Sequence, residues 1–265
     1  MAITAAMVKE LREMTGAGMM DCKKALAETD GDMDAAVEVL RKSGAAKAEK
    51  KASRIAAEGI TRTAANDNTA VVVEVNSETD FVAKNAEFTG LVNDILTSIM
   101  NGNPETVEDA LKLTVNGETV EDLIINKTAK IGEKLSLRRF AKLTKCDNEV
   151  FGSYIHGGRI AVLTVLEGTN EEVAKHVSMQ AASMRPSYVR ISDVPEEVVA
   201  REAEVLKEQA MNEGKPAEIA EKMVQGRIQK FYKEICLAEQ PFIKDGDVSV
   251  AKYVANNGGE ILKMV

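Results

Sequence analysis

The chain has 265 residues, of which 45% are hydrophobic and 29% charged, a balance typical of globular proteins with one large domain or two to three small ones. Its 42 acidic residues outnumber its 34 basic residues, which gives a formal net charge of −8 and a sequence pI near 5.1. Because nucleic-acid phosphates require a basic face and bases stack on aromatic rings, this acidity and the aromatic content of 4% argue against direct nucleic-acid binding. No run of about 18 apolar residues occurs, so we expect no membrane-spanning helix.

The three cysteines indicate the redox environment. Cys22, Cys146 and Cys236 lie far apart in the sequence, in a pattern that matches neither a disulfide framework nor a paired zinc site and favours a reducing compartment. The N-terminal residues lack the apolar block of a signal peptide. The sequence therefore predicts a cytoplasmic protein.

Residues 1–43 are predicted to form a module of three helices. Apolar side chains recur at helical spacing in three short segments, and turns containing glycine separate the segments at residues 15–18 and 30–32. A unit this small is marginally stable alone and is suited to docking. Residues 44–57 follow as a linker rich in alanine and lysine, which we expect to be a solvated helix, with phosphate binding as the alternative.

Beyond the linker, the apolar pattern changes from helical to β. Strands are predicted at residues 70–75, 135–141 and 161–166, because β-branched and apolar residues gather there. A long helix is expected to begin near Glu78, after the first strand, and another near Glu171, after the third. Strands with helices on one face predict an α+β fold.

The strand-and-helix pattern occurs twice. Superposed without gaps, residues 82–84 and residues 173–175 carry the same three amino acids, Val-Ala-Lys. We infer a duplication that produced two core subdomains, at residues 58–146 and 147–265.

Residues 193–235 are predicted to form a helical hairpin inserted in the second subdomain. Asp193, Pro195 and Glu196 are typical of a helix start, as a capping Asp, a first-turn Pro and a capping-box Glu. Residues 212–216 form the predicted turn between two helices that share a thin apolar seam. Such a hairpin serves contacts, and the sequence leaves self-association open.

No enzyme signature is apparent. His156 and His176 have no metal-ligand partner at helical or turn spacing, and no nucleophile elbow of the form G-x-S-x-G occurs. The spacing of Gly16, Gly18 and Lys23 is not that of a phosphate-binding loop. We expect no catalytic residue, no metal site and no cofactor.

The segment between the first strand and its helix stands out. Residues 77–80, Ser-Glu-Thr-Asp, have the form of a capping box. Phe81 follows at once, where the second copy has Glu172. Two readings stay open: Phe81 packs on the core face that it shares with Phe88, or it is an exposed aromatic side chain that enters a partner's pocket.

These segments carry a family resemblance. Residues 11–26, LREMTGAGMMDCKKAL, and residues 79–84, TDFVAK, resemble two signatures of the elongation factor Ts family, the guanine-nucleotide exchange factors of elongation factor Tu. Residues 130–133, 152–156 and 214–216 resemble further segments of that family, in the family's order. The resemblance covers essentially the whole chain and implies an N-terminal module like a ubiquitin-associated domain, two related core subdomains and a coiled-coil hairpin.

The resemblance also implies functional roles. It implies that a helix tip enters the GTPase domain of elongation factor Tu, in its GDP-bound and nucleotide-free states, and disturbs the Mg²⁺ and phosphate site so that GDP leaves and GTP rebinds. That tip comprises Thr79, Asp80, Phe81 and Val82. Further partner contacts are implied for Lys23, Ile131, Gly132 and His156. A solvated position for Lys23 and a local hydrogen bond for His156 are the alternatives.

Two other functions remain open at this point. A translation-associated RNA-binding protein would use the lysine-rich linker with Arg138 and Arg139. A small-molecule enzyme on the α+β core would need a convergent polar pocket, for which the sequence shows no sign. Members of the family commonly continue beyond the segment that matches residues 259–262, whereas this sequence stops at Val265. Either the chain is naturally short or a C-terminal segment has been lost, so the contacts that the family makes with that segment are not assigned to this chain.

Overall fold

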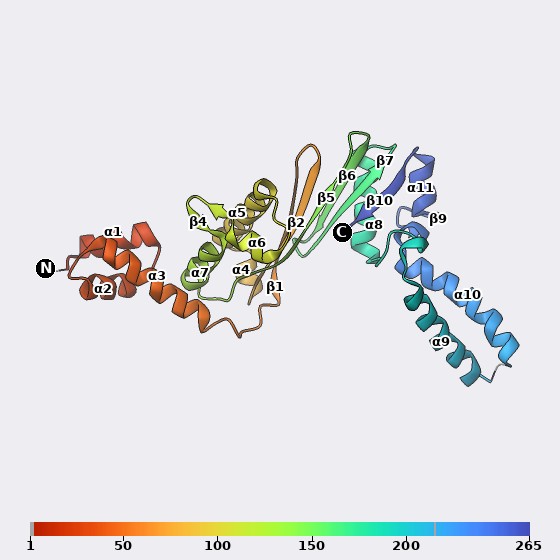
Figure 1. Cartoon of the computed structure of the whole chain (residues 1–265), viewed down its shortest axis with the longest axis horizontal. Coiled ribbons are helices and arrows are strands. Elements are labelled where there is room, and N and C mark those ends of the chain that lie inside the picture. The colour runs from red at the N-terminus through yellow and green to blue at the C-terminus, as the bar shows by residue number, and fades with distance from the viewer. Residues whose placement is uncertain (1–2, 215) are drawn as a thin grey trace. The chain divides into compact units, whose positions relative to one another are not determined.

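The computed structural model describes residues 3–214 and 216–265, in which helices and antiparallel strands are mixed (Figure 1). This mixture confirms the α+β class. The chain divides into two compact units. The first comprises the residues up to Ala64 together with Val73–Phe140, and the second comprises Ala65–Val72 together with Ala141–Val265.

Three helices form the N-terminal module, α1 (Ala5–Thr15), α2 (Met19–Glu28) and α3 (Met33–Glu49). Gly16 ends α1 in the left-handed region, with φ at 66°, which glycine adopts without the steric cost of a Cβ. Six buried side chains form the core of the module: Val8, Leu11, Cys22, Ala25, Leu26 and Ala36. The predicted helices are confirmed, while their likeness to a ubiquitin-associated domain stays a prediction.

The third helix extends into the predicted linker. It ends at Glu49, and Gly44 is buried in it, where an added Cβ would lie 3.5 Å from the Cβ of Ala129. The Arg41 guanidinium lies 2.7 Å from the Asp122 carboxylate. Both partners belong to α7 (Val120–Ile131), so α3 packs on α7 and this part of the linker is not wholly solvated.

One sheet has the order β1 (Glu58–Ala65), β2 (Thr69–Ser77) and β5 (Ser136–Thr144), with β2 in the centre, and the larger part of β1, β2 and β5 belongs to the first unit. The predicted strands at residues 70–75 and 135–141 are thereby confirmed, whereas β1 was not foreseen. The remaining elements of this unit are α4 (Asp80–Ala83), α5 (Ala86–Gly102), α6 (Val107–Lys112), β3 (Thr114–Val115), β4 (Glu118–Thr119) and α7.

The long helix expected from Glu78 is wrong, because the chain forms two helices there. Thr79 caps α4, which ends after four residues. Asn85 then caps α5, since its side chain accepts a hydrogen bond of 2.7 Å from the backbone N–H of Glu87. The apolar spacing predicted for this segment is confirmed, because the core residues of α5, Phe88 among them, are buried.

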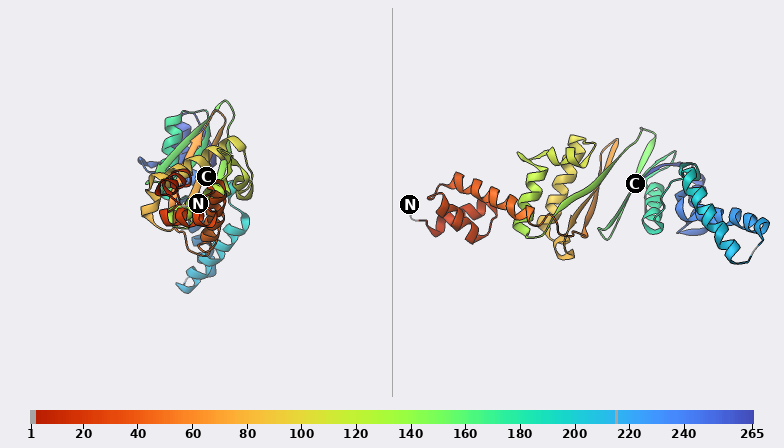
Figure 2. Two further views of the ribbon diagram at one scale, coloured as in Figure 1. Left: turned by 90° about the vertical axis from the view of Figure 1, so that its left-hand side faces the viewer. Right: turned by 60° about the horizontal axis from the view of Figure 1, so that its bottom comes forward.

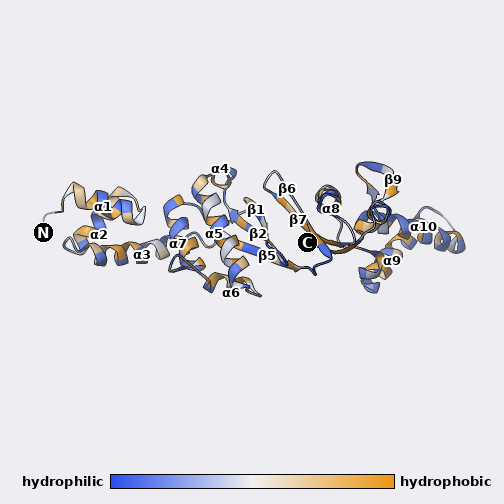
Figure 3. Ribbon diagram, turned by 90° about the horizontal axis from the view of Figure 1, so that it is seen from above, coloured by the Kyte–Doolittle hydropathy of each residue, from blue (hydrophilic) through white to orange (hydrophobic). Residues whose placement is uncertain are grey.

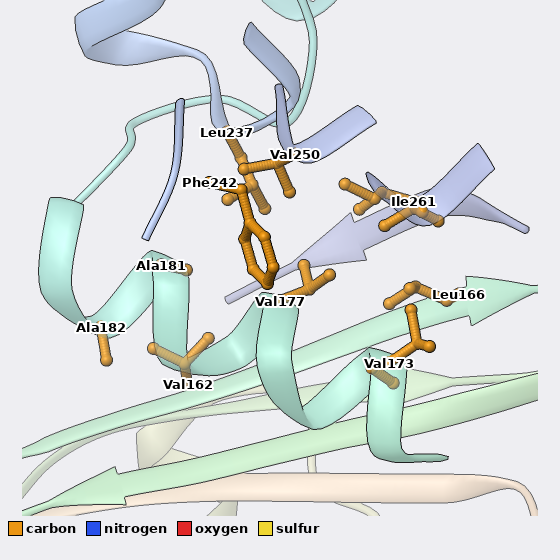
Figure 4. Packing of buried hydrophobic residues seen from close by; sticks show 12 residues of the cluster. Val162, Leu166, Val173, Val177, Ala181, Ala182, Leu237, Phe242, Val250 and Ile261 are labelled. Carbon is orange, nitrogen blue, oxygen red and sulfur yellow. The ribbon is translucent and has the colours of Figure 1, made fainter. Parts of the chain in front are cut away.

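The second unit has the sheet order β10 (Glu260–Met264), β7 (Ile160–Glu167) and β6 (Glu149–His156), with antiparallel pairing on both sides of β7. The predicted strand at residues 161–166 and the helix near Glu171, which is α8 (Glu171–Met184), are confirmed. Side chains from β7, α8, β10 and residues 237–250 form a common hydrophobic core with Phe242 (Figure 4). The other elements are η1 (Ile191–Asp193), α9 (Glu196–Asn212), α10 (Ala217–Ile235), η2 (Leu237–Glu239), β8 (Pro241–Phe242), β9 (Asp245–Ser249) and α11 (Val250–Asn256).

The two units share an order of elements. In the first, β1 and β2 are followed by α5, α7 and the closing strand β5, which lies beside β2. In the second, β6 and β7 are followed by α8, α11 and the closing strand β10, which lies beside β7. A duplication would leave this shared order, with α9 and α10 inserted in the second copy.

The inserted helices α9 and α10 lie side by side (Figures 1 and 2). The buried side chain of Ala210 lies on α9 and that of Ala220 on α10. The predicted cap of α9 is wrong: Pro195 is its N-cap, and Asp193 instead accepts a hydrogen bond of 3.1 Å from the backbone N–H of Arg190, which closes η1. Lys215 of the predicted turn lies outside the described residues, and a coiled-coil character of the pair stays a prediction.

Hydrophobic and hydrophilic residues are interspersed along the helices, which is typical of elements with one buried face (Figure 3). Among the helices of residues 3–214 and 216–265, none combines the length and the apolar character needed to cross a membrane.

The close packing of β6 under α8 leads to a first prediction. A Cβ at buried Gly152 would overlap the carbonyl oxygen of Ala174 and the hydroxyl of Thr164. We expect Gly152→Ala to lower the free energy of unfolding by about 1–3 kcal/mol, measured by urea denaturation. The control is Gly226→Ala in α10, where a Cβ meets nothing within 4 Å and alanine raises the stability of the helix by up to about 1 kcal/mol. Equal effects of the two substitutions would contradict the packing described for Gly152.

A second prediction concerns pH. Burial lowers the pKa of His176 below its usual value of 6.5, and the Lys244 ammonium lowers it further, against the opposing charge of Glu172. His176 Nδ1 also lies 2.8 Å from the Tyr253 hydroxyl. Because the unfolded chain then binds the proton more readily, the stability due to neutral His176 is present above about pH 6.5 and is lost as the pH falls.

We therefore expect the unfolding free energy to decrease between about pH 7 and pH 5, and to decrease less in His176→Gln. Denaturant titrations of both proteins across this range measure the difference. An identical pH dependence in the two proteins would show that His176 does not contribute.

Candidate partner-binding site at the start of α4

The side chain of Phe81 is exposed to solvent. Its exposed fraction is 82%, whereas Phe88 is fully buried. Because α4 ends before α5 begins, the seven-residue spacing does not place the two rings on one helical face. The core-packing reading of Phe81 is therefore wrong and the ring is exposed, while its entry into a partner's pocket stays a prediction.

The neighbours of Phe81 in the sequence complete the helix tip. The Thr79 hydroxyl accepts a hydrogen bond of 3.5 Å from the backbone N–H of Val82, so Thr79 is the N-cap in place of the predicted Ser77. The Asp80 carboxylate lies 2.8 Å from the Lys84 ammonium, one helical turn further on. The tip thus presents an aromatic ring next to an exposed ion pair.

The start of α4 is joined to the segment after α7 through two carboxylates, one from each side. One oxygen of Glu133 accepts hydrogen bonds from the backbone N–H groups of Glu78, at 3.1 Å, and Thr79, at 3.0 Å. The other oxygen accepts from the Thr79 hydroxyl at 2.6 Å. In return, the Glu78 carboxylate accepts from the backbone N–H of Lys134 at 2.6 Å. We call this reciprocal set of hydrogen bonds, which joins residues 78–79 to residues 133–134, the clasp.

Basic groups reinforce the clasp. Arg54 Nη1 lies 3.3 Å from the Glu78 carboxylate, and Lys134 Nζ donates to the carbonyl oxygens of Ala52 and Arg54. The hydrogen bond from the Lys134 backbone lowers the pKa of Glu78 below its usual value, and Arg54 lowers it further, against partial desolvation. Ile55, next to Arg54, is 85% exposed and is a second open apolar side chain.

Ile131 and Gly132 lead directly into the clasp. Gly132 ends α7 with φ at 89°, and its N–H donates to the carbonyl of Thr128 at 3.0 Å. This left-handed turn favours glycine. The structure therefore brings Ile131 and Gly132 together with the helix tip, within the first unit.

Lys23 and His156 lie elsewhere. Lys23 is exposed on α2, near the exposed side chains of Met19 and Met20. His156 ends β6 in the second unit, where it is exposed and its Nδ1 lies 3.1 Å from the hydroxyl of Tyr154. A local hydrogen bond of His156 is thus present, and partner contacts of both residues stay predictions.

The basic pair considered for RNA binding shares one carboxylate of this chain, which balances one of its two positive charges. Arg139 Nε lies 2.6 Å from the Glu74 carboxylate, and Arg138 Nε lies 3.6 Å from it.

Among the described residues, no group of three or more His, Cys, Asp or Glu side chains is placed to hold a metal ion.

Sequence reasoning missed Glu133, the residue that makes most of the clasp. The family resemblance includes Glu133 only as the last residue of the segment 130–133, and nothing in the sequence links it to Thr79, which lies more than 50 positions away. A glycine and a charged residue after a helix are ordinary, and their contacts depend on the fold.

A comparison with family models decides the family. The model described as "Elongation factor TS" matches residues 78–265, more than half of the chain. The chain belongs to the elongation factor Ts family. The match includes the helix tip and both sides of the clasp. The resemblance drawn from the sequence is thereby confirmed, and so is a general role in translation elongation.

The exposure of Phe81 in this elongation factor Ts family member leads to a third prediction. We expect Phe81→Ala to change the free energy of unfolding by less than about 0.5 kcal/mol, because the ring contributes little to the core. The matched control is Phe88→Ala, which removes a fully buried ring and lowers the unfolding free energy by about 3–5 kcal/mol. Thermal or urea unfolding compares them, and a large loss for Phe81→Ala would contradict its exposure.

Proposed function

We propose that the protein binds elongation factor Tu and promotes GDP release by inserting the helix tip near the Mg²⁺ and phosphate site of that partner. Membership in the elongation factor Ts family supports this proposal. The single observation that carries it is Phe81, an aromatic side chain 82% exposed at the start of a helix that the clasp holds in place. Rebinding of GTP then completes the exchange.

An exposed aromatic ring has a physical meaning. Leaving a Phe side chain in water forgoes about 1.5–3 kcal/mol that burial would supply. An apolar pocket between helices of a partner recovers that free energy and makes the ring an anchor. Asp80, on the same turn, is a hydrogen-bond acceptor for donors at the rim of such a pocket.

The mechanism needs no catalytic group on this chain. Mg²⁺ and backbone donors hold the nucleotide phosphates in the partner, and a side chain that displaces those loops removes part of that stabilisation. Linkage then requires that GDP weakens binding of this protein by the factor by which this protein weakens binding of GDP. Each tenfold change needs about 1.4 kcal/mol, which one buried aromatic ring and a few polar contacts supply. The protein is an exchange factor rather than an enzyme.

The remaining contacts divide between the two units. In this proposal Ile131 and Gly132 meet the partner beside the helix tip, and Lys23 does so from the N-terminal module. His156 makes its contact from the second unit. The reaction takes place in the cytoplasm, where translation occurs.

A fourth prediction tests the proposal. Stopped-flow release of a fluorescent GDP analogue from elongation factor Tu should accelerate with the concentration of this protein and reach a plateau. We expect Phe81→Ala to lower the plateau rate by about 30-fold or more, as the loss of an anchor side chain of about 2 kcal/mol would. The control is Ile243→Ala, which truncates an exposed apolar side chain of the second unit and should leave the rate unchanged.

Two outcomes would contradict the proposal. Folded parent protein that fails to accelerate release at any concentration would refute the exchange function. Equal plateau rates for the parent and Phe81→Ala would refute the role of the helix tip while leaving exchange intact.

A further inference from the structure

We propose that Glu133 is a positioning residue, which fixes the direction in which α4 presents Phe81 and thereby sets the maximal rate of nucleotide release. This inference rests on the proposed exchange function. It concerns a side chain that lies outside the helix tip and acts on the partner only through its hydrogen bonds to Glu78 and Thr79.

The helix tip cannot hold itself. α4 has four residues, a single turn, and helix formation over so short a segment is unfavourable in water because nucleation orders several residues for one hydrogen bond. Among its four residues only Ala83 is buried, while Phe81 is in solvent. The direction of the ring must therefore come from contacts outside α4.

Glu133 supplies those contacts. Its carboxylate accepts hydrogen bonds from three donors on Glu78 and Thr79, all immediately before the first residue of α4. Hydrogen bonds to an ionised acceptor are shorter and about twice as strong as neutral ones. One carboxylate thus fixes the backbone and the side chain of the N-cap residue at once.

The base of this carboxylate is rigid. Gly132, directly before Glu133, is fixed by its hydrogen bond to Thr128, and the buried backbone N–H of Leu135 donates to the Thr128 hydroxyl at 3.3 Å. The Glu78 carboxylate bonds back to Lys134. The helix tip is therefore connected by hydrogen bonds in both directions to the segment after α7, which is itself bonded to the buried Thr128.

The second unit shows that the fold itself does not require such a connection. Its corresponding helix, α8, is capped by its own Asn170, whose side chain accepts from the backbone N–H of Val173 at 3.0 Å. α8 has 14 residues and buries seven of them, so packing orients it. The start of α4, which carries Phe81, thus has the clasp in addition to its own cap. The start of α8, which carries Glu172, is held by its cap and by the packing of the helix.

A positioning role differs from a merely structural one in what it changes. Docking through the N-terminal module and the second unit sets the concentration at which exchange is half-maximal. A displaced helix tip lowers the plateau rate, because each encounter must then order the tip before Phe81 is inserted. A structural role would lower thermal stability and raise the half-maximal concentration.

The test compares Glu133→Ala and Glu133→Gln with a matched control, Glu87→Gln. Glu87 also bonds to α7, through Lys127 at 2.8 Å and Lys130 at 2.6 Å, but it makes none of the hydrogen bonds of the clasp. For Glu133→Ala we expect a plateau release rate about tenfold lower, with a half-maximal concentration within about twofold of the parent. Glu133→Gln keeps one acceptor oxygen, so its plateau rate should lie between those of the parent and of Glu133→Ala. The plateau rate of Glu87→Gln should equal that of the parent.

A second readout needs no partner. Hydrogen exchange of the backbone amides of Val82 and Ala83 in the free protein should be about tenfold faster in Glu133→Ala than in the parent, while buried amides of α5 stay protected. This measurement detects loosening of the tip even in a variant whose overall stability is unchanged.

The outcomes separate the two proposals. Parent protein that does not accelerate release would refute the exchange function and this inference with it. Parent protein that accelerates release, together with a Glu133→Ala variant of unchanged plateau rate and unchanged hydrogen exchange, would overturn the positioning role alone. The positioning role would also be overturned if Glu133→Ala lowered the plateau rate only in proportion to a lower melting temperature, and if Glu87→Gln lowered that rate equally.

Discussion

Reciprocal hydrogen bonds, between Glu78 and Lys134 and between Glu133 and Thr79, connect the exposed start of α4 to the segment that follows α7. In the proposed function these hydrogen bonds resolve a conflict between the requirements of binding and of folding. A side chain that anchors a partner must lie in solvent, where packing cannot orient it, yet it must be held firmly to avoid a large loss of entropy on binding. Hydrogen bonds to the backbone on either side satisfy both requirements, because they fix the chain without covering the ring.

The left-handed turn at Gly132 makes this connection possible. α7 must end abruptly for the next two residues to reach the start of α4, and a residue with a Cβ would be strained at a φ of 89°. The same helix also receives α3 through the ion pair of Arg41 and Asp122. α7 thus organises the first unit, since it contacts the N-terminal module along its length and the helix tip at its end.

The sequence predicted what local periodicity determines. The three N-terminal helices, the strands around Val73 and Leu163 and the buried face of α5 all follow from apolar spacing, and the family follows from two signatures. The break between α4 and α5 was missed because Asn85 is compatible with a helix interior and with a cap, and only the fold decides between them. The exposure of Phe81 and the bonds of Glu133 depend on contacts between distant residues, which periodicity does not encode.

The two units share an order of elements but differ at the start of one helix, which is where the proposed binding function is placed. Both have a helix that starts after the central strand of a sheet, and both place an exposed side chain at the second position of that helix, Phe81 in one and Glu172 in the other. A charged residue there is favourable at a helix start and needs no partner. An exposed phenylalanine is unfavourable in the free protein, and the free energy that its exposure costs is recovered when an apolar pocket of a partner covers the ring. The short helix α4, held at its start by the clasp, keeps the Phe81 ring exposed for such a pocket.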